Sequence, residues 1–317
     1  LLTAVKLVFA STYYRAPKVF SQRVGHRSEE EQMAVLIQRL VGQRYGNYFY
    51  PDISGVAQSS NYYPFAGTKP EDGIAAIALG MGKTVMEGGQ VLRFCPQHPH
   101  IQPQSSGVRD VLQQAQRFFY ALNMDSECSR LETGDAGNLT RREIMEAKDE
   151  APVRRLASTY MPQEDRIRDR FDSRGHPVLT FASVLKHGHY PLSEILKEGL
   201  KMGEEGLGAP VEMEFAADLE EGVEGGPVFA FLQVRPMSAR SEMAPVDIED
   251  EEIQAALCYS NRALGNGVNH GITDIVYVKP WDFSPSQTRA AAAEIGRINA
   301  ELSRQGRSYL LIGPGRW

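Results

Sequence analysis

The sequence contains little cysteine, no long apolar run and no block of basic residues. Its three cysteines, Cys95, Cys128 and Cys258, are scattered and show no CxxC spacing. This argues against a disulfide framework and a zinc site, and it is typical of a protein of the reducing cytoplasm. No apolar run approaches the length of a membrane span, and the first residues lack the layout of a signal peptide. We therefore expect a cytoplasmic protein that does not enter a membrane.

Charge is spread over the chain without a strong excess of either sign. Lysine and arginine total 34 against 40 acidic residues, and basic residues do not interleave with aromatic ones. A nucleic acid is therefore not an expected partner, and any phosphate site has to be local. With 317 residues, of which 42% are hydrophobic and 23% charged, the chain is globular in composition and long enough for two domains.

Two segments around residue 220 carry the clearest local pattern. Val211–Asp218 and Val228–Pro236 alternate with a period of two, which predicts strands with one buried face. The connection between them is rich in glycine and glutamate and predicts a hairpin loop. On the first strand one face holds Val211, Met213, Phe215 and Ala217, and the other holds Glu212, Glu214 and Asp218. On the second strand the alternation places Gln233 and Arg235 on the face of Phe229 and Phe231.

Folding this hairpin brings carboxylates beside a carboxamide and a guanidinium. Magnesium takes oxygen ligands from one or two carboxylates, with substrate phosphates completing its octahedron. Arginine offers a planar fork to phosphate oxygens. Candidates for a magnesium-nucleotide site are therefore Glu212, Glu214, Gln233 and Arg235. The spacing alone fits an ordinary hairpin with a charged outer face equally well.

The residues of the hairpin also resemble a known family. PVEMEFAAD and FAFLQVRPM are similar to the closing hairpin of the ATP-grasp domain of phosphoenolpyruvate synthase and pyruvate phosphate dikinase, where the pattern is D-I-E-[WF] followed by L-Q-x-R-P. The resemblance implies that Glu214 and Gln233 are linked to magnesium. It also implies that Arg235 contacts phosphate and is catalytic together with Glu214. Glu212, the third candidate metal ligand, stands where the family has aspartate.

Upstream segments extend the resemblance to the adenine side of the nucleotide. VFASTYYRA resembles a family helix with the pattern V-[FW]-x-S…R-A, which makes Arg15 a candidate nucleotide-binding residue, although a solvated helix residue is the alternative. Met33–Val41 shows helical spacing, yet it is similar to the family's A-V-x-V-Q-x-M-V strand, and we expect a strand. Gln38, Arg39 and Leu40 are then candidate adenine contacts, with core packing as the alternative for Leu40.

Two glycine-containing segments fit the family as well. YFYPDISGVAQSS resembles its S-G-V-x-[FY]-[ST] strand, and Asp72–Pro96 predicts a strand, a turn at Gly80–Gly82 and a second strand. The following Lys83 and Thr84 do not complete a P-loop, because that motif needs glycine at position 77, which is Ile77. We expect a strand-to-strand turn there.

The remaining elements are predicted from periodicity and composition. Arg109–Leu122 predicts an amphipathic helix within a helical or irregular insertion at about 103–186. Tyr190–Gly208 predicts a helix that leads into the hairpin. After an acidic linker, a βαβ unit with parallel strands is predicted from a strand at Asp274–Lys279, a helix ending near Arg304 and a strand at Tyr309–Ile312.

The histidines do not form a recognisable site. His98 and His100, and His187 and His189, form HxH pairs without a third metal ligand, which favours surface or core roles. In the family, phosphate passes to a histidine of a swivelling domain that follows the hairpin. No T-x-H-x-[AS] stretch follows Pro236 in this sequence.

The resemblance covers residues 1–237 and implies the fold class. We expect an α+β or α/β protein with the later portion of an ATP-grasp domain at 1–242, a mixed sheet closed by the antiparallel hairpin, and a small α/β domain at 243–317. The chain opens without methionine and stops after GPGRW. We therefore expect a piece of a longer protein, truncated at both ends, which by itself binds nucleotide weakly and turns over nothing.

The leading functional expectation is an ATP-binding phosphotransferase related to phosphoenolpyruvate synthase. Its cofactors would be ATP and Mg²⁺, and its partner a small-molecule phosphoryl acceptor such as pyruvate. One alternative is a nucleotide-binding regulatory module that keeps the ATP-grasp fold without a phosphohistidine relay. Another is an ATP-grasp ligase that activates a carboxylate, which the Q-x-R-P ending disfavours.

Overall fold

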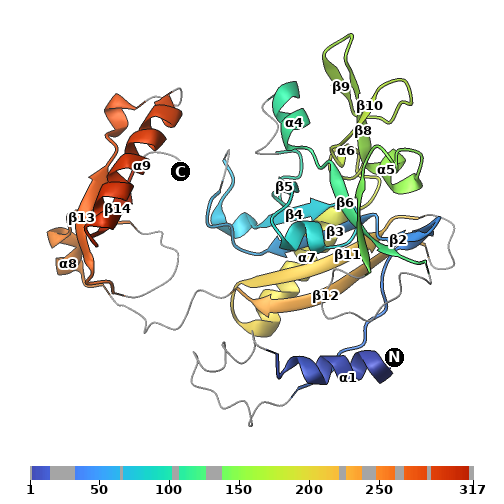
Figure 1. Cartoon of the computed structure of the whole chain (residues 1–317), viewed down its shortest axis with the longest axis horizontal. Coiled ribbons are helices and arrows are strands. Elements are labelled where there is room, and N and C mark those ends of the chain that lie inside the picture. The colour runs from blue at the N-terminus through green and yellow to red at the C-terminus, as the bar shows by residue number, and fades with distance from the viewer. Residues whose placement is uncertain are drawn as a thin grey trace. The chain divides into compact units, whose positions relative to one another are not determined.

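The chain divides into two compact units, at residues 1–237 and 238–317. The computed structural model describes residues 2–14, 33–64, 67–101, 107–125, 138–220, 226–237, 248–260, 268–283 and 287–313. Helices and strands are both present, which confirms the α+β class (Figure 1). Among the described residues, every helix is too short or too polar to cross a membrane.

A sheet of five described strands forms the centre of the first unit. Its strands are β3 (Ile53–Gln58), β4 (Ile74–Ala78), β5 (Leu92–Phe94), β11 (Val211–Asp218) and β12 (Val228–Pro236). They lie in the order β12-β11-β3-β4-β5, and β11 and β12 form the expected hairpin (Figure 1). Every pairing in this sheet is antiparallel, so the expectation of a mixed sheet is wrong in this detail.

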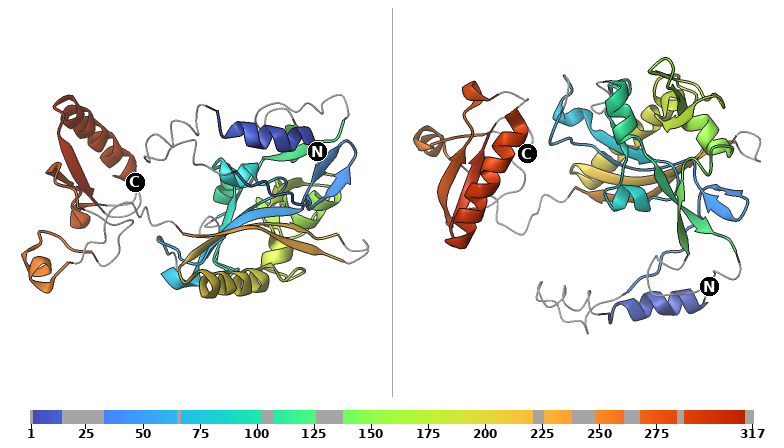
Figure 2. Two further views of the ribbon diagram at one scale, coloured as in Figure 1. Left: turned by 90° about the horizontal axis from the view of Figure 1, so that it is seen from below. Right: turned by 45° about the horizontal axis from the view of Figure 1, so that its top comes forward.

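Helix α7 (Leu192–Leu207) lies against one face of this sheet, as the left view of Figure 2 shows. It confirms the helix expected before the hairpin and ends at Gly208 in the left-handed conformation. Two glycines allow the close packing. A Cβ on Gly199 would lie 2.8 Å from the Phe231 ring, and one on Gly203 would lie 3.0 Å from Val211.

Two smaller sheets are also present in the described part of the first unit. One has the order β1-β2-β6-β7, with β1 (Gln43–Tyr45), β2 (Tyr48–Tyr50), β6 (Phe118–Asn123) and β7 (Leu139–Glu143). The other has the order β10-β8-β9, with β8 (Ala157–Met161), β9 (Arg166–Arg168) and β10 (His176–Leu179). The short helices beside them are η1 (Pro70–Asp72), α3 (Lys83–Met86), α4 (Val108–Gln114), α5 (Ala151–Leu156) and α6 (Ala182–Leu185).

The prediction of a helical or irregular segment at 103–186 is therefore wrong, because five strands lie in its described part. The helix predicted at Arg109–Leu122 ends at Gln114, and β6 begins at Phe118. The run Phe118-Phe119-Tyr120 is rich in aromatic residues and alternates in burial, with Phe119 buried and its neighbours half-buried. Both properties favour a strand, and the helical stripe read through this run was a coincidence of spacing.

The segment before β1 also differs from expectation. The predicted strand at Met33–Val41 is wrong, because residues 33–42 have no regular secondary structure and Leu36, Ile37 and Leu40 are exposed. Within the described residues no strand pairs with this segment. Its backbone amides therefore lack the hydrogen bonds to a neighbouring strand that would hold it in a sheet. Leu40 is not a core residue either. Helix α1 (Leu2–Ser11) confirms the helix expected near the start of the chain.

The turn expected at Gly80–Gly82 is present but leads into helix α3 before β5 begins. Lys83, the first residue of α3, lies 3.5 Å from Glu87 and above the ring of Tyr120. The Lys83 ammonium is thus engaged by protein groups.

The core of the first unit gives one stability prediction. Gly55 of β3 pairs with Phe215, and a Cβ on Gly55 would lie 2.5 Å from the Phe215 ring and 2.7 Å from the Ala76 carbonyl oxygen. We expect Gly55→Ala to lower the free energy of unfolding by about 1–3 kcal/mol, because overpacking forces these groups apart. Urea unfolding measures the change. Gly206→Ala, on exposed α7 surface with nothing near the new Cβ, is the control and is expected to be neutral or slightly stabilising. Equal losses in both variants would contradict the packing argument.

The second unit contains the expected βαβ arrangement. Strands β13 (Ile272–Tyr277) and β14 (Ser308–Ile312) pair in parallel, and α9 (Thr288–Arg304) connects them. Helix α8 (Asp250–Ala255) and the short helix η4 (Pro280–Asp282) are its other described elements.

Candidate functional site

The hairpin brings together the acid, amide and guanidinium side chains that the sequence singled out. In the register of β11 and β12, Glu212 lies opposite Arg235 and Glu214 lies opposite Gln233. Side chains that are opposite one another in an antiparallel pair share a face and lie close enough to interact. The polar residues therefore form two neighbouring cross-strand pairs on one surface.

A bulge in β12 decides which surface this is. Phe215 pairs with Phe231 although its neighbour Glu214 pairs with Gln233, so Leu232 is the extra residue. The expectation that Gln233 and Arg235 share the face of Phe229 and Phe231 is therefore wrong. Simple alternation cannot anticipate the change of face, because one inserted residue shifts every later side chain to the other side.

The apolar residues confirm the assignment of faces. Phe229 stacks on Phe215 with ring centroids 5.2 Å apart, and Phe231 approaches Gly199 of α7. Val211 and Met213 also approach α7 glycines, at 3.0 Å and 3.2 Å from the positions that a Cβ would take. The residues that alternate with them, Glu212 and Glu214, consequently lie on the face away from α7.

Glu212 is held by two neighbours on that face. Its Oε1 accepts hydrogen bonds from Nε of Arg235 at 3.0 Å and from Nη2 of the same guanidinium, and its Oε2 accepts one from Nε2 of Gln58 at 2.7 Å. Burial alone would raise the pKa of Glu212, but the bonds from Arg235 and Gln58 hold that pKa below its usual value. Both carboxylate oxygens are thus engaged by the protein.

Gln58 is a member of this cluster that the sequence did not reveal. It is the last residue of β3 and lies opposite Glu212 in the β3–β11 register. It stands at the position where the family pattern S-G-V-x-[FY]-[ST] has an aromatic residue. That departure was the one available signal, but its meaning depends on a pairing between segments about 150 residues apart.

Glu214 and Gln233 make fewer polar contacts with the protein than Glu212 does. In the described part of the chain neither side chain makes a hydrogen bond or an ion pair; Glu214 is half-buried and Gln233 exposed. The charge of Glu214 contributes, after that of Glu212, to raising the pKa of Arg235. No cluster of three histidine, cysteine or acidic residues that could hold a metal occurs among the described residues. One carboxylate and one amide oxygen suit magnesium when phosphates supply further ligands.

Of the three candidate adenine contacts in the segment before β1, one lies beside the hairpin and two are exposed. Gln38 donates from Nε2 to the carbonyl oxygen of Leu232, the bulge residue, at 3.0 Å. Arg39 and Leu40 are exposed and make no hydrogen bond among the described residues. Arg15 lies outside the described residues. The structure therefore brings Gln38 to the edge of the cluster but leaves the roles of the other three as proposals.

A comparison with protein families supports the resemblance that the hairpin residues carry. The sequence model of the family described as pyruvate phosphate dikinase, AMP/ATP-binding domain, matches residues 1–255. The chain belongs to this family. No curated protein matches the chain at a significant level. The match of the pyruvate phosphate dikinase AMP/ATP-binding domain covers the whole first unit and continues through α8.

Proposed function

We propose that the chain binds magnesium-ATP on the polar face of the hairpin and serves a phosphotransferase related to phosphoenolpyruvate synthase. The supporting observation is the pair of cross-strand partners on one face, Glu214 with Gln233 and Glu212 with Arg235. The phosphoryl acceptor would be a small molecule such as pyruvate. Gln38, Arg39, Leu40 and Arg15 are the proposed contacts on the nucleotide's adenine side.

The contacts of each side chain indicate the role that we propose for it. Glu214 and Gln233 would hold the magnesium ion, which when bound neutralises charge on the phosphates. Glu212 has both oxygens engaged, so we give it the task of holding Arg235 rather than the metal. Glu212 occupies Nε and Nη2 of Arg235, and the side chain is 53% exposed, so Nη1 can meet a phosphate oxygen.

The binding half of this proposal is tested by Glu214→Gln in the intact protein. We expect the apparent Kd for magnesium-ATP to rise by about 10- to 100-fold, because the amide loses the charge that attracts the ion. Isothermal titration calorimetry measures the affinity, and exchange of phosphate from ATP measures turnover. Glu205→Gln, at an exposed site on α7, is the matched control and should bind like wild type. Equal affinities for Glu214→Gln and wild type would remove Glu214 from the site.

A nucleotide-sensing module is the second candidate function. It is favoured by the βαβ unit of β13, α9 and β14, which follows the hairpin where the family's phosphate-carrying histidine domain would stand. Tight binding of ATP or AMP by the intact protein without any phosphate exchange would support this candidate over the phosphotransferase.

A further inference from the structure

A cavity of about 310 Å³ lies in the first unit, and none of its lining residues belongs to the hairpin. Its walls come from β5, α4, β9 and the end of β10. Much of the lining is apolar and includes Leu92, Val111, Ile167, Leu179 and Phe181. The volume falls at the lower end of the range for small-molecule sites, about 300–1,000 Å³, and the apolar lining is typical of them.

The two buried polar side chains of the walls, Gln116 and Thr180, are already hydrogen-bonded within the protein. The Gln116 amide accepts a bond from the Leu79 N–H at 2.8 Å and donates to the carbonyl oxygens of Leu79 and Phe118. The Thr180 hydroxyl is bonded to that of Ser158 at 2.5 Å. These groups hold the walls together and do not call for a polar ligand, so the body of a ligand here has to be apolar.

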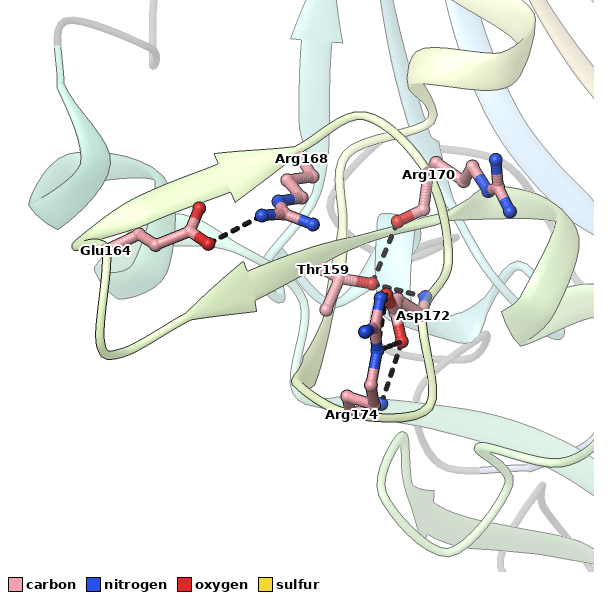
Figure 3. Close-up of polar contacts among 6 residues, drawn as sticks. All are labelled: Thr159, Glu164, Arg168, Arg170, Asp172 and Arg174. Carbon is pink, nitrogen blue, oxygen red and sulfur yellow. Dashed lines mark hydrogen bonds and ion pairs between the residues drawn. The ribbon is translucent and has the colours of Figure 1, made fainter.

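Among the charged residues that line the cavity, one positive charge is not balanced by a negative one. Asp169 and Lys186 form an ion pair at 3.1 Å and balance each other. In the described part of the chain the exposed Arg166 guanidinium makes no hydrogen bond or ion pair. On the same strand, Arg168 turns to Glu164 at 2.5 Å, and beyond the strand Arg174 is bonded to Asp172 (Figure 3). Arg166 is thus the lining cation that remains available to a ligand anion.

One wall of the cavity is held in an unfavourable backbone conformation. Phe181 is 1% exposed and has a φ of +54°, in the left-handed region that bulky residues rarely adopt. Such a conformation is strained, and strained backbone is concentrated at ligand clamps and functional sites. It fixes the buried ring at the junction of β10 and α6.

We infer that this cavity binds a small organic carboxylate with an aromatic or branched apolar body. The body fills the space between Val111, Ile167 and Phe181, and the carboxylate pairs with Arg166. The inference does not rest on the proposed nucleotide function, because the two sets of residues do not overlap. It gives the segment at 103–186 a role in recognising a second small molecule.

Phenylacetate and its neutral analogue 2-phenylethanol test the inference on the intact protein. We expect saturable binding of phenylacetate by calorimetry and at least about tenfold weaker binding of 2-phenylethanol, since a charge-assisted bond to Arg166 is lost. Arg166→Gln should weaken phenylacetate binding by a similar factor and leave 2-phenylethanol unchanged. Val111→Trp should abolish the binding of both. Arg168→Gln, on the same strand but outside the cavity, is the matched control and should bind phenylacetate like wild type.

Several outcomes would overturn the inference. Absence of saturable phenylacetate binding removes the site, and equal affinity for the two probes removes the carboxylate. An unchanged affinity in Arg166→Gln, an exposed position that does not endanger folding, removes the assignment of that residue. Magnesium-ATP affinity is measured in the same variants. It should be unaffected by Arg166→Gln, so failure at one site is distinguishable from failure at the other.

Discussion

Replacing Arg235 by glutamine is expected to lower phosphoryl transfer from magnesium-ATP by the intact protein about 100- to 1,000-fold. A positioned donor to a developing phosphate charge contributes on this order to catalysis. Glutamine keeps a donor but loses the charge and the fork that can bind Glu212 and a phosphate oxygen together. Single-turnover kinetics measure the step, and we expect the rate to fall more than the affinity for magnesium-ATP.

Two further variants make this prediction specific. Arg235→Lys keeps the charge but not the planar fork, so it should restore only a small part of the rate. Gln58→Leu removes the bond to Oε2 of Glu212 while leaving Arg235 in place, so its effect at neutral pH should be smaller. A wild-type rate in Arg235→Gln, with unchanged unfolding free energy, would contradict the assignment.

The role of Gln58 can be tested in the pH dependence of the phosphoryl-transfer rate. The bonds from Arg235 and Gln58 lower the pKa of Glu212, and Glu212 has to be ionised to hold Arg235. Loss of the Gln58 bond raises that pKa, so the acid limb of the rate profile should move to higher pH in Gln58→Leu. A purely structural loss would lower the rate at every pH and leave the limb in place.

The parts of the fold that the sequence predicted are those with a sustained local pattern. Helix α7 has a continuous apolar stripe and ends in glycine, and the hairpin strands alternate over eight and nine residues. The prediction that the acids of β11 lie beside Gln233 and Arg235 was right although the alternation assigned these two residues to the wrong face. The alternation of side-chain faces counted from Phe229 is interrupted at Leu232. The residue types around a bulge do not reveal it.

Other features depend on contacts that a local pattern cannot show. The helical spacing of Arg109–Leu122 spans two elements, because pairing with β2 and β7 fixes β6 as a strand, and that pairing is not visible in a helical count of apolar residues. Met33–Val41 has apolar residues in a strand-like or helical order, yet Leu36, Ile37 and Leu40 stay exposed in the structure described. The bond from Gln58 to Glu212 depends on the pairing of β3 with β11, which joins distant parts of the chain.

Asp52 gives the second large expected effect, in the pH dependence of stability. It is 1% exposed, and its Oδ2 accepts bonds from Nη1 of Arg155 at 2.5 Å and from the Leu219 N–H at 2.6 Å. Its Oδ1 has no hydrogen-bond partner among the described residues. Burial outweighs the attraction of Arg155 and raises the pKa of Asp52 from 3.8 to about 6.

The raised pKa of Asp52 determines whether the protein gains or loses stability as the pH rises. Between pH 4 and pH 6 the folded protein binds the Asp52 proton more tightly than the unfolded chain does. The resulting stabilisation is complete below the unfolded pKa of 3.8 and is lost as the pH rises through about 6. A shift of this size corresponds to about 3 kcal/mol. Other groups also titrate in this range, so the informative quantity is the difference between wild type and Asp52→Asn, which removes the titration.

Urea unfolding of both proteins from pH 4 to pH 8 measures that difference. We expect the unfolding free energy of wild type minus that of Asp52→Asn to fall by about 3 kcal/mol as the pH rises across this range. Asp149→Asn, which removes an exposed partner of Arg154, should give a nearly constant difference because an exposed ion pair contributes little. Parallel curves for wild type and Asp52→Asn would mean that Asp52 titrates alike in both states. In that case Arg155 and the Leu219 amide would fully offset the cost of burying the carboxylate.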